Sequence, residues 1–187
     1  MSDRIPLPRP GQGADKARMD EILRVDHAGE YAAVLIYRAQ RAVFEARKGR
    51  EAITRDLGEM QDQEAVHLAR FERLLNERKV RPTAMTPVWR LAASALGAGT
   101  ALIGEKAAHA CTEAVESVIE QHYADQIAEI GDRDPALAAE LMQFREEELA
   151  HHDHAIEHGS REAPAYRLLS GVIKAGCRAA IKISEKV

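Results

Sequence analysis

Apolar residues recur with a period near 3.6 from about Met19 to the end of the chain, which is the spacing of amphipathic α-helices. The pattern predicts five helical segments, over residues 16–48, 52–79, 88–131, 134–158 and 163–184. Glycine or proline lies in or beside each connection between them. Because short connections join antiparallel helices, the sequence predicts an all-α bundle.

Two regions depart from this regular pattern. Gly97, Gly99 and Gly104 weaken the middle of the third segment, so it is either one long helix or two. The first 15 residues contain prolines at positions 6, 8 and 10 and are predicted to be an extended N-terminal arm. They resemble neither a signal peptide nor an Arg-rich transit peptide. The remaining residues, 16–187, suit a single domain with its own core.

Two segments are candidates for contact with a membrane. Residues 91–104 are uncharged, but a helix that crosses a bilayer needs about 20 apolar residues, so we expect no single-pass span here. Segment 163–184 carries Lys or Arg at every fourth position from Lys174 onward, with apolar residues between them, which predicts a basic amphipathic helix. This helix either docks on the bundle with a solvated basic face or contacts a membrane surface.

The composition supports a helical fold and narrows the range of partners. Aromatic residues make up only 4% of the chain, which argues against a strand-rich sandwich or barrel. The formal net charge is −4, so there is no global positive field and we expect no nucleic-acid partner. Positive charge is local, with a net +4 from Arg161 to Val187. Two cysteines are too few for a zinc site or a disulfide framework and fit a reducing compartment.

The chain contains an internal repeat that carries its candidate chemistry. The two halves align at three pairs of positions: Glu30 with Glu116, Tyr37 with Tyr123, and Gln40 with Gln126. Each half continues into a second helix that contains Glu-x-x-His, at Glu64 and His67 in the first half and at Glu148 and His151 in the second. From the first Glu to the second there are 34 and 32 residues, as expected if each half is one antiparallel helix pair.

The position of these residues on their helices is more informative than the motif, since about one Glu-x-x-His arises by chance in a sequence of this composition. Glu64 and His67 continue the apolar stripe of the second predicted helix. The Glu and His of the fourth predicted helix do the same. Glu30 and Glu116 also lie in line with apolar residues of their helices. The repeat therefore places six polar residues on faces that are predicted to be buried.

Four carboxylates on buried faces need a partner of opposite charge. An ionised group in apolar surroundings costs several kcal/mol unless it is paired, and otherwise takes up a proton. Glu and His three residues apart project from one helix face and can reach the same ion. Hard oxygen donors with imidazole suit iron or manganese, and two divalent ions balance four carboxylates. The alternative is that these residues are surface charges and satisfied core histidines.

A Glu from each of two helices, with Glu-x-x-His from each of two others, is the arrangement of ferritin-like dinuclear carboxylate proteins. The sequence therefore predicts a ferritin-like four-helix bundle built from two repeated helix pairs. The additional hydrophobic segment and the C-terminal amphipathic helix lie outside that bundle.

The other histidines are ambiguous. His152, His154 and His158 are expected to fan around their helix axis and to be solvated. For His109 and His122, packing or hydrogen bonding near the ligands is expected rather than metal ligation.

Several longer segments are more specific than Glu-x-x-His. They read VDHAGEY at 25–31, EAVH at 64–67, EEELAHHD at 146–153, APAY at 163–166 and AGCR at 175–178. Together they closely resemble the 5-demethoxyubiquinone hydroxylases of ubiquinone biosynthesis, a ferritin-like di-iron family, from about residue 17 to the C-terminus. The resemblance implies a membrane-associated monooxygenase that hydroxylates the ring of a prenylated demethoxyquinone, using O2 and two electrons.

Carried onto this sequence, the resemblance also implies the residues of the site. Two iron ions would be held by six ligands: Glu30, Glu64, His67, Glu116, Glu148 and His151. Among these, Glu64 and Glu148 are the implied bridging carboxylates. His122 and Tyr123 match a His-Tyr pair near the metals that is associated with substrate or electron transfer.

Cofactors, partners and location follow from the same resemblance. NADH or another two-electron reductant is implied, with a prenylated quinone, a membrane surface and other ubiquinone-biosynthesis proteins as partners. The expected location is peripheral, on the cytoplasmic face of a bacterial cell membrane or on the matrix face of the mitochondrial inner membrane for a mature eukaryotic form. The alternative function is a ferritin-like iron-storage or peroxide-scavenging protein, although a rubrerythrin-type peroxidase would add Cys-x-x-Cys pairs that this sequence lacks.

Overall fold

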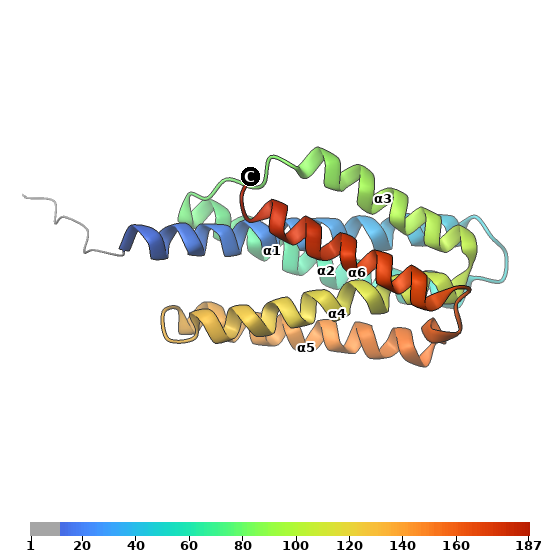
Figure 1. The fold of residues 1–187 in the computed structure, drawn as a ribbon. Helices are drawn as coiled ribbons and strands as arrows, with labels where there is room; N and C mark the ends of the chain where they lie inside the picture. The colour runs from blue at the N-terminus through green and yellow to red at the C-terminus, as the bar shows by residue number, and fades with distance from the viewer. Residues whose placement is uncertain (1–11) are drawn as a thin grey trace, which may run out of the picture.

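A computed structural model describes residues 12–187, and side chains from residue 15 onward. The described chain forms six α-helices and one short 3-10 helix (Figure 1). Their bounds are Gln12–Glu45 (α1), Glu51–Arg78 (α2), Thr86–Ile103 (α3), Glu105–Ile130 (α4), Pro135–Glu157 (α5), Ser160–Glu162 (η1) and Tyr166–Ser184 (α6). The predicted all-α class is confirmed.

Two antiparallel helix pairs make up the bundle (Figure 1). In the first pair α1 packs on α2, and in the second α4 packs on α5, so each pair is one half of the predicted repeat. The two remaining long helices lie outside this bundle: α3 packs along α1, and α6 crosses over α4 and α1. The architecture is therefore a ferritin-like four-helix bundle with two additional helices.

The structure corrects one predicted boundary and decides between two alternatives at another. Helix α1 begins at Gln12, so the last four residues of the predicted extended arm are helical, and the other residues of that arm lie outside the described range. The prolines that suggested an extended chain all precede this start, and Asp15 in the first turn favours a helix N-terminus. The predicted segment 88–131 is two helices, α3 and α4, separated by Gly104.

Gly104 breaks the helix because of its backbone conformation. Its φ of 144° and ψ of 175° belong to a region that residues with a Cβ rarely adopt. The other two glycines of this segment remain helical. At Gly97 a Cβ would lie 2.4 Å from the carbonyl oxygen of Ile36, so α3 approaches the backbone of α1 closely there.

The bundle interior consists of two apolar clusters with a polar layer between them. Along α2, Leu57 and Met60 belong to one cluster, and Phe71 and Leu74 belong to the other. Between them the buried face of α2 carries a carboxylate and an imidazole. The apolar clusters hold the helices together on both sides of this layer and thereby fix the separation of the polar side chains within it.

Helices α3 and α6 expose apolar side chains to solvent. None of the helices in the described chain is both long enough and apolar enough to cross a membrane. Even so, Leu91 and Leu102 of α3 are 75% and 61% exposed, and Leu168 and Val172 of α6 are 70% and 63% exposed. These side chains lie on the two helices that cover the outside of the bundle.

Candidate metal centre

Four helices contribute to one buried cluster of carboxylates and imidazoles in the polar layer. One glutamate comes from α1, one from α4, and a Glu-x-x-His pair from each of α2 and α5. None of the six is more than 4% exposed. These six residues, called the candidate ligands below, are Glu30, Glu64, His67, Glu116, Glu148 and His151. The structure thus brings together all six residues that the sequence singled out.

The candidate ligands divide into two overlapping groups of four. One group is Glu30, Glu64, His67 and Glu148, and the other is Glu64, Glu116, Glu148 and His151. Within each group, one donor atom per residue lies within 4.8 Å of the others. Two carboxylates, Glu64 and Glu148, belong to both groups. This is the relation expected of carboxylates that bridge two ions.

Contacts across the bundle connect the two halves of the repeat. His67 Nδ1 lies 3.2 Å from Glu148 Oε1 and 3.5 Å from Glu30 Oε2. His151 Nδ1 lies 3.1 Å from Glu64 Oε1. Each imidazole therefore faces the glutamate of the other helix pair as well as that of its own motif.

The inward-facing atoms of this cluster have no hydrogen-bond partners among the described residues. Eight buried atoms are in this state: Oε2 of Glu30, both carboxylate oxygens of Glu64 and of Glu148, Oε2 of Glu116, and Nδ1 of His67 and of His151. An unsatisfied buried polar group costs about 1–3 kcal/mol, and more if it is charged. Six oxygens and two imidazole nitrogens are a suitable donor set for two iron or manganese ions.

Without a cation, this cluster favours protonated carboxyls. Burial raises the pKa of Glu64 and of Glu116 well above the usual carboxyl value, and repulsion from Glu148 raises both further. Burial also raises the pKa of Glu30. For Glu148 the effect of burial is outweighed by the imidazoles of His151 and His67, which lower its pKa to about 2. Metal binding would therefore displace protons from the site.

Two buried tyrosines hold the glutamates that come from α1 and α4. The Tyr37 hydroxyl on α1 donates to Glu116 Oε1 on α4 at 2.5 Å. In the reverse direction, the Tyr123 hydroxyl on α4 donates to Glu30 Oε1 on α1. This contact places Tyr123 beside the candidate ligands. Each tyrosine leaves one carboxylate oxygen free to face the centre.

The outer nitrogens of both imidazoles are also held, by two residues that sequence reasoning missed. His67 Nε2 lies 2.5 Å from Glu147 Oε2, and His151 Nε2 lies 2.6 Å from Gln63 Oε1. If Nε2 carries the proton and donates it in a hydrogen bond to these oxygens, Nδ1 keeps a free lone pair that faces the centre and can bind a metal. Gln63 and Glu147 each directly precede the glutamate of a Glu-x-x-His motif. This shared position in the repeat is the signal that could have identified them.

His122 has a different position from that of Tyr123. Its Nε2 lies 2.9 Å from Gln126 Nε2 and 3.5 Å from Asp26 Oδ1, so the half-buried His122 forms a polar group with two buried residues. Burial would lower the pKa of His122, but the hydrogen bond and charge of Asp26 outweigh this effect and raise it. His122 also lines a groove of about 430 Å³ with the basic side chains of Lys174, Arg178 and Lys182.

An apolar cavity of about 370 Å³ lies between α1, α3 and α6. Its walls include Gly29 and Ala32 of α1, Trp89 and Leu96 of α3, and Ile173 of α6. Because Gly29 directly precedes a candidate ligand in α1, the cavity extends to the same turn of helix as the polar layer. Cavities of this size and composition bind apolar ring or chain compounds.

Comparison with known proteins identifies the family to which this chain is similar. Residues 17–184 match the family described as ubiquinone biosynthesis protein COQ7. A 3-demethoxyubiquinol 3-hydroxylase from Rhodospirillum rubrum is 49% identical over 178 residues, which cover 95% of this chain and 82% of that protein. A mitochondrial NADPH-dependent 3-demethoxyubiquinone 3-hydroxylase from Mus musculus is 48% identical, over 92% of this chain and 79% of that protein.

A more distant relative is similar over almost the same length. The mitochondrial 5-demethoxyubiquinone hydroxylase of Saccharomyces cerevisiae is 40% identical, over 93% of this chain and 80% of that protein. These matches confirm the resemblance that the sequence segments indicated. With a family match over nearly its whole length and relatives of this similarity, the chain belongs to the COQ7 family of ubiquinone biosynthesis proteins.

Proposed function

We propose that this protein hydroxylates the ring of a prenylated demethoxyquinone, or of its quinol, at two iron ions held by the candidate ligands. The observation that carries the proposal is the set of eight unpartnered buried atoms of the candidate ligands, together with an apolar cavity whose wall includes Gly29, the residue before Glu30. The names of the relatives indicate demethoxyubiquinone or demethoxyubiquinol as the substrate class.

The proposed reaction replaces one ring C–H bond with a C–OH group. One atom of O2 enters the product and the other leaves as water, with the uptake of two electrons and two protons. NADPH, which appears in the name of the mouse relative, or NADH would supply the electron pair. When bound, the iron ions supply the redox chemistry that activates O2.

The residues of this chain would hold the iron ions in position and keep their surroundings free of water. The four carboxylates would balance the charge of two divalent ions, and Glu64 and Glu148, which belong to both groups of four, would be available to both ions. Tyr37 and Tyr123 orient by hydrogen bonds the two glutamates that come from α4 and α1. The apolar clusters on either side of the polar layer exclude water, which strengthens electrostatic interactions within it.

The cavity between α1, α3 and α6 is the proposed route for the quinone. A prenylated quinone is almost insoluble in water, so the substrate must come from lipid. Exposed leucines on α3 and α6 would meet the bilayer, and the basic side chains of α6 would attract anionic lipid headgroups. We propose peripheral binding to the cytoplasmic face of a bacterial cell membrane or to the matrix face of the mitochondrial inner membrane, where other ubiquinone-biosynthesis proteins are possible partners.

Iron content and hydroxylation in matched variants test the site. The purified protein should contain about two iron ions per chain and convert demethoxyquinone to the hydroxylated product when supplied with O2 and NADPH or NADH. Glu64→Ala and Glu148→Ala should lose both iron and activity. Glu59→Ala and Glu146→Ala, at exposed positions on the same two helices, should keep both. Hydroxylation that persists in Glu64→Ala or Glu148→Ala would refute the assigned ligands.

Lipid extracts separate this function from iron storage and from peroxide removal. A strain that lacks the gene should accumulate demethoxyquinone, and the wild-type gene should restore the product. A storage protein would instead bind many more iron ions per chain, and neither a storage protein nor a peroxide-removing protein would change the quinone pool. An unchanged quinone pool in the strain without the gene would overturn the proposed function.

A further inference from the structure

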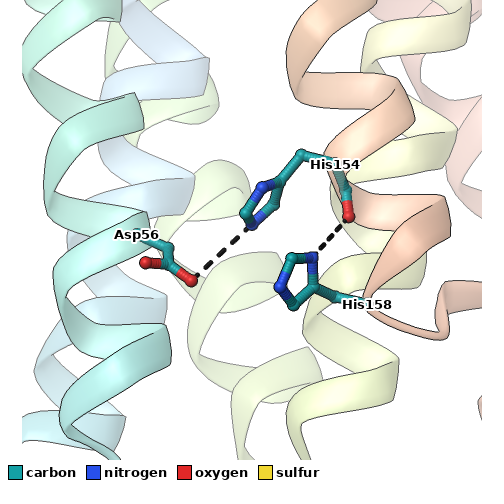
Figure 2. A group of neighbouring side chains, drawn as sticks. All are labelled: Asp56, His154 and His158. Carbon is teal, nitrogen blue, oxygen red and sulfur yellow. Dashed lines mark hydrogen bonds and ion pairs between the residues drawn. The ribbon is translucent and has the colours of Figure 1, made fainter.

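A second group of metal-binding side chains lies outside the candidate ligands (Figure 2). Asp56 comes from α2, His154 from the last turn of α5, and His158 directly follows that helix as its C-cap residue. One donor atom from each lies within 4.8 Å of the other two. The expectation that these two histidines fan around the helix axis is wrong, whereas His158 is exposed as expected. Residues four apart share a helix face, and their rings stack with centroids 3.9 Å apart.

The His158 ring is held in the tautomer that a metal ligand requires. Its Nδ1 lies 2.8 Å from the backbone carbonyl oxygen of His154, which can only accept a hydrogen bond. Nδ1 therefore carries the proton, and Nε2 keeps its lone pair. Figure 2 shows the ring turned so that this second nitrogen points toward Asp56. A ring N–H donated to a backbone carbonyl is a common way to fix metal-ligating histidines.

The gap between Asp56 and His154 is suited to an ion rather than to a hydrogen bond. His154 Nε2 is buried without a hydrogen-bond partner among the described residues, and it lies 3.7 Å from Asp56 Oδ2. That distance is too long for a hydrogen bond. Two donors on one tetrahedral zinc ion, each about 2.0–2.1 Å from it, lie about 3.3–3.4 Å apart, so a small movement of either side chain from 3.7 Å would let both reach the ion. The other oxygen of Asp56 accepts a hydrogen bond from Arg55 at 3.3 Å.

His109 of α4 closes the inner side of this group. It is only 5% exposed, and its ring centroid lies 5.9 Å from that of His154 and 5.3 Å from that of His158. Burial, with the two neighbouring imidazoles, lowers the pKa of His109 to about 4, and burial lowers the pKa of His154. These rings are therefore neutral near pH 7, with lone pairs available for a metal.

We propose that Asp56, His154 and His158 form a mononuclear site for a divalent first-row transition metal, separate from the six candidate ligands. One carboxylate and two imidazoles suit Zn²⁺ or Fe²⁺ and leave coordination positions for water. His154 is one helical turn from His151 along α5, and His158 is exposed. The site therefore lies between solvent and the buried centre.

Zinc binding to the iron-loaded full chain tests this proposal. Equilibrium dialysis against Zn²⁺, with metals counted by mass spectrometry, should find one Zn²⁺ per chain in addition to the iron. Asp56→Asn and His158→Ala should each weaken this binding at least tenfold. Because His158 is exposed, its replacement should leave the fold intact, and far-ultraviolet circular dichroism would verify this. Iron content and hydroxylation should stay at the wild-type level in both variants.

The matched control is His152→Ala, on the same helix, because the His152 ring contacts Asp153 rather than this group. The control should bind Zn²⁺ as the wild type does. Unchanged binding in both Asp56→Asn and His158→Ala would overturn the proposal. So would an equal loss in His152→Ala, which would mean that zinc binds surface histidines without selection. Because hydroxylation is measured separately, either result leaves the proposed function untouched.

Discussion

The hydroxyl of Tyr123 on α4 donates a hydrogen bond to the carboxylate of Glu30 on α1. At the equivalent positions of the repeat, the hydroxyl of Tyr37 on α1 donates to the carboxylate of Glu116 on α4. Each half of the chain thus orients a glutamate of the other half. The two contacts connect the helix pairs within the polar layer itself, where apolar packing does not act.

Removing these hydroxyls should weaken iron binding. Tyr37→Phe or Tyr123→Phe leaves a buried carboxylate oxygen without its donor, and loss of such a partner typically costs about 10–100-fold in metal affinity or activity. Iron affinity from competition with a chelator would measure the effect. Tyr31→Phe makes the same chemical change on α1 in a side chain that packs against a different apolar cluster, and it should bind iron normally. Equal affinities in all three variants would contradict the assigned role.

Iron binding should release protons and tighten as pH rises. In the metal-free protein, burial raises the pKa of Glu64 and Glu116. Burial would lower the pKa of His67, but Glu148 and Glu30 outweigh it and raise that pKa to about 11. At pH 7 His67 therefore holds a proton, and the raised pKa values of the two glutamates favour their protonated forms, whereas metal ligands must be deprotonated. Titration calorimetry in two buffers of different ionisation enthalpy measures the release, and identical heats in both buffers would rule it out.

Glu113 should stabilise the C-terminal region in a pH-dependent way. Its buried carboxylate on α4 accepts hydrogen bonds from Ser160, from Arg161 at 3.1 Å and from Tyr166 at 2.8 Å. Burial opposes ionisation, but these donors prevail and lower the pKa of Glu113. The stabilisation is therefore complete above the unfolded-state pKa near 4.5 and is lost as pH falls through the lower folded-state pKa.

Glu113→Gln tests this contribution by denaturant unfolding at two pH values. At pH 7 the variant should lose about 1–3 kcal/mol of unfolding free energy, because the bonds of an ionised acceptor are lost. The deficit should shrink at pH 3. Glu162→Gln, which breaks an exposed ion pair with Lys106, is the control and should change little. A deficit that stays constant with pH would mean that the charge of Glu113 is irrelevant.

Two glycines of α3 should respond in opposite ways to alanine. Gly97→Ala places a Cβ 2.4 Å from the Ile36 carbonyl oxygen, so α3 must move away from α1, at a cost of about 1–3 kcal/mol. At Gly99 no atom lies within 4 Å of the added Cβ, and alanine should stabilise the helix by about 0.5–1 kcal/mol. Thermal denaturation of both variants measures the difference. If both were stabilised, the close packing of α3 on α1 would be wrong.

Vesicle binding should depend on the exposed leucines of α3 and α6. The double variant Leu102→Glu with Leu168→Glu should float less with phosphatidylcholine–phosphatidylglycerol vesicles and show a higher KM for the quinone, because it charges the apolar surface. Val66→Glu on α2 is the control, since that side chain is 65% exposed on a helix of the bundle. Equal flotation of the variants would show that the lipid contact lies elsewhere.

The periodicity of the sequence was sufficient to locate the candidate ligands. On a helix, spacing decides which residues share a face, so the apolar pattern around Glu64 and His67 is enough to place both on the buried face of α2. Contacts between helices were harder to predict. That Glu147 reaches His67, or that Asp56 faces His154, depends on how α2 and α5 are rotated toward each other.

The different roles of the three glycines in the 88–131 segment could not be predicted from the sequence either. In the sequence they are equivalent helix-weakening residues. Only the tertiary structure separates Gly97, which allows close packing, from Gly104, which ends a helix. The shared face of His154 and His158, in contrast, could have been predicted, because residues four apart lie on one side of a helix.

Gly104 also determines the direction in which the chain runs. If it continued the helix, residues 86–130 would form a straight rod of about 68 Å, more than twice the thickness of a bilayer's hydrocarbon core. Instead the backbone reverses within one residue, and α3 runs toward the end of the bundle from which α4 departs (Figure 1). One glycine therefore lets the same stretch of chain cover the outside of the bundle as α3 and return through it as α4, the helix that carries Glu116.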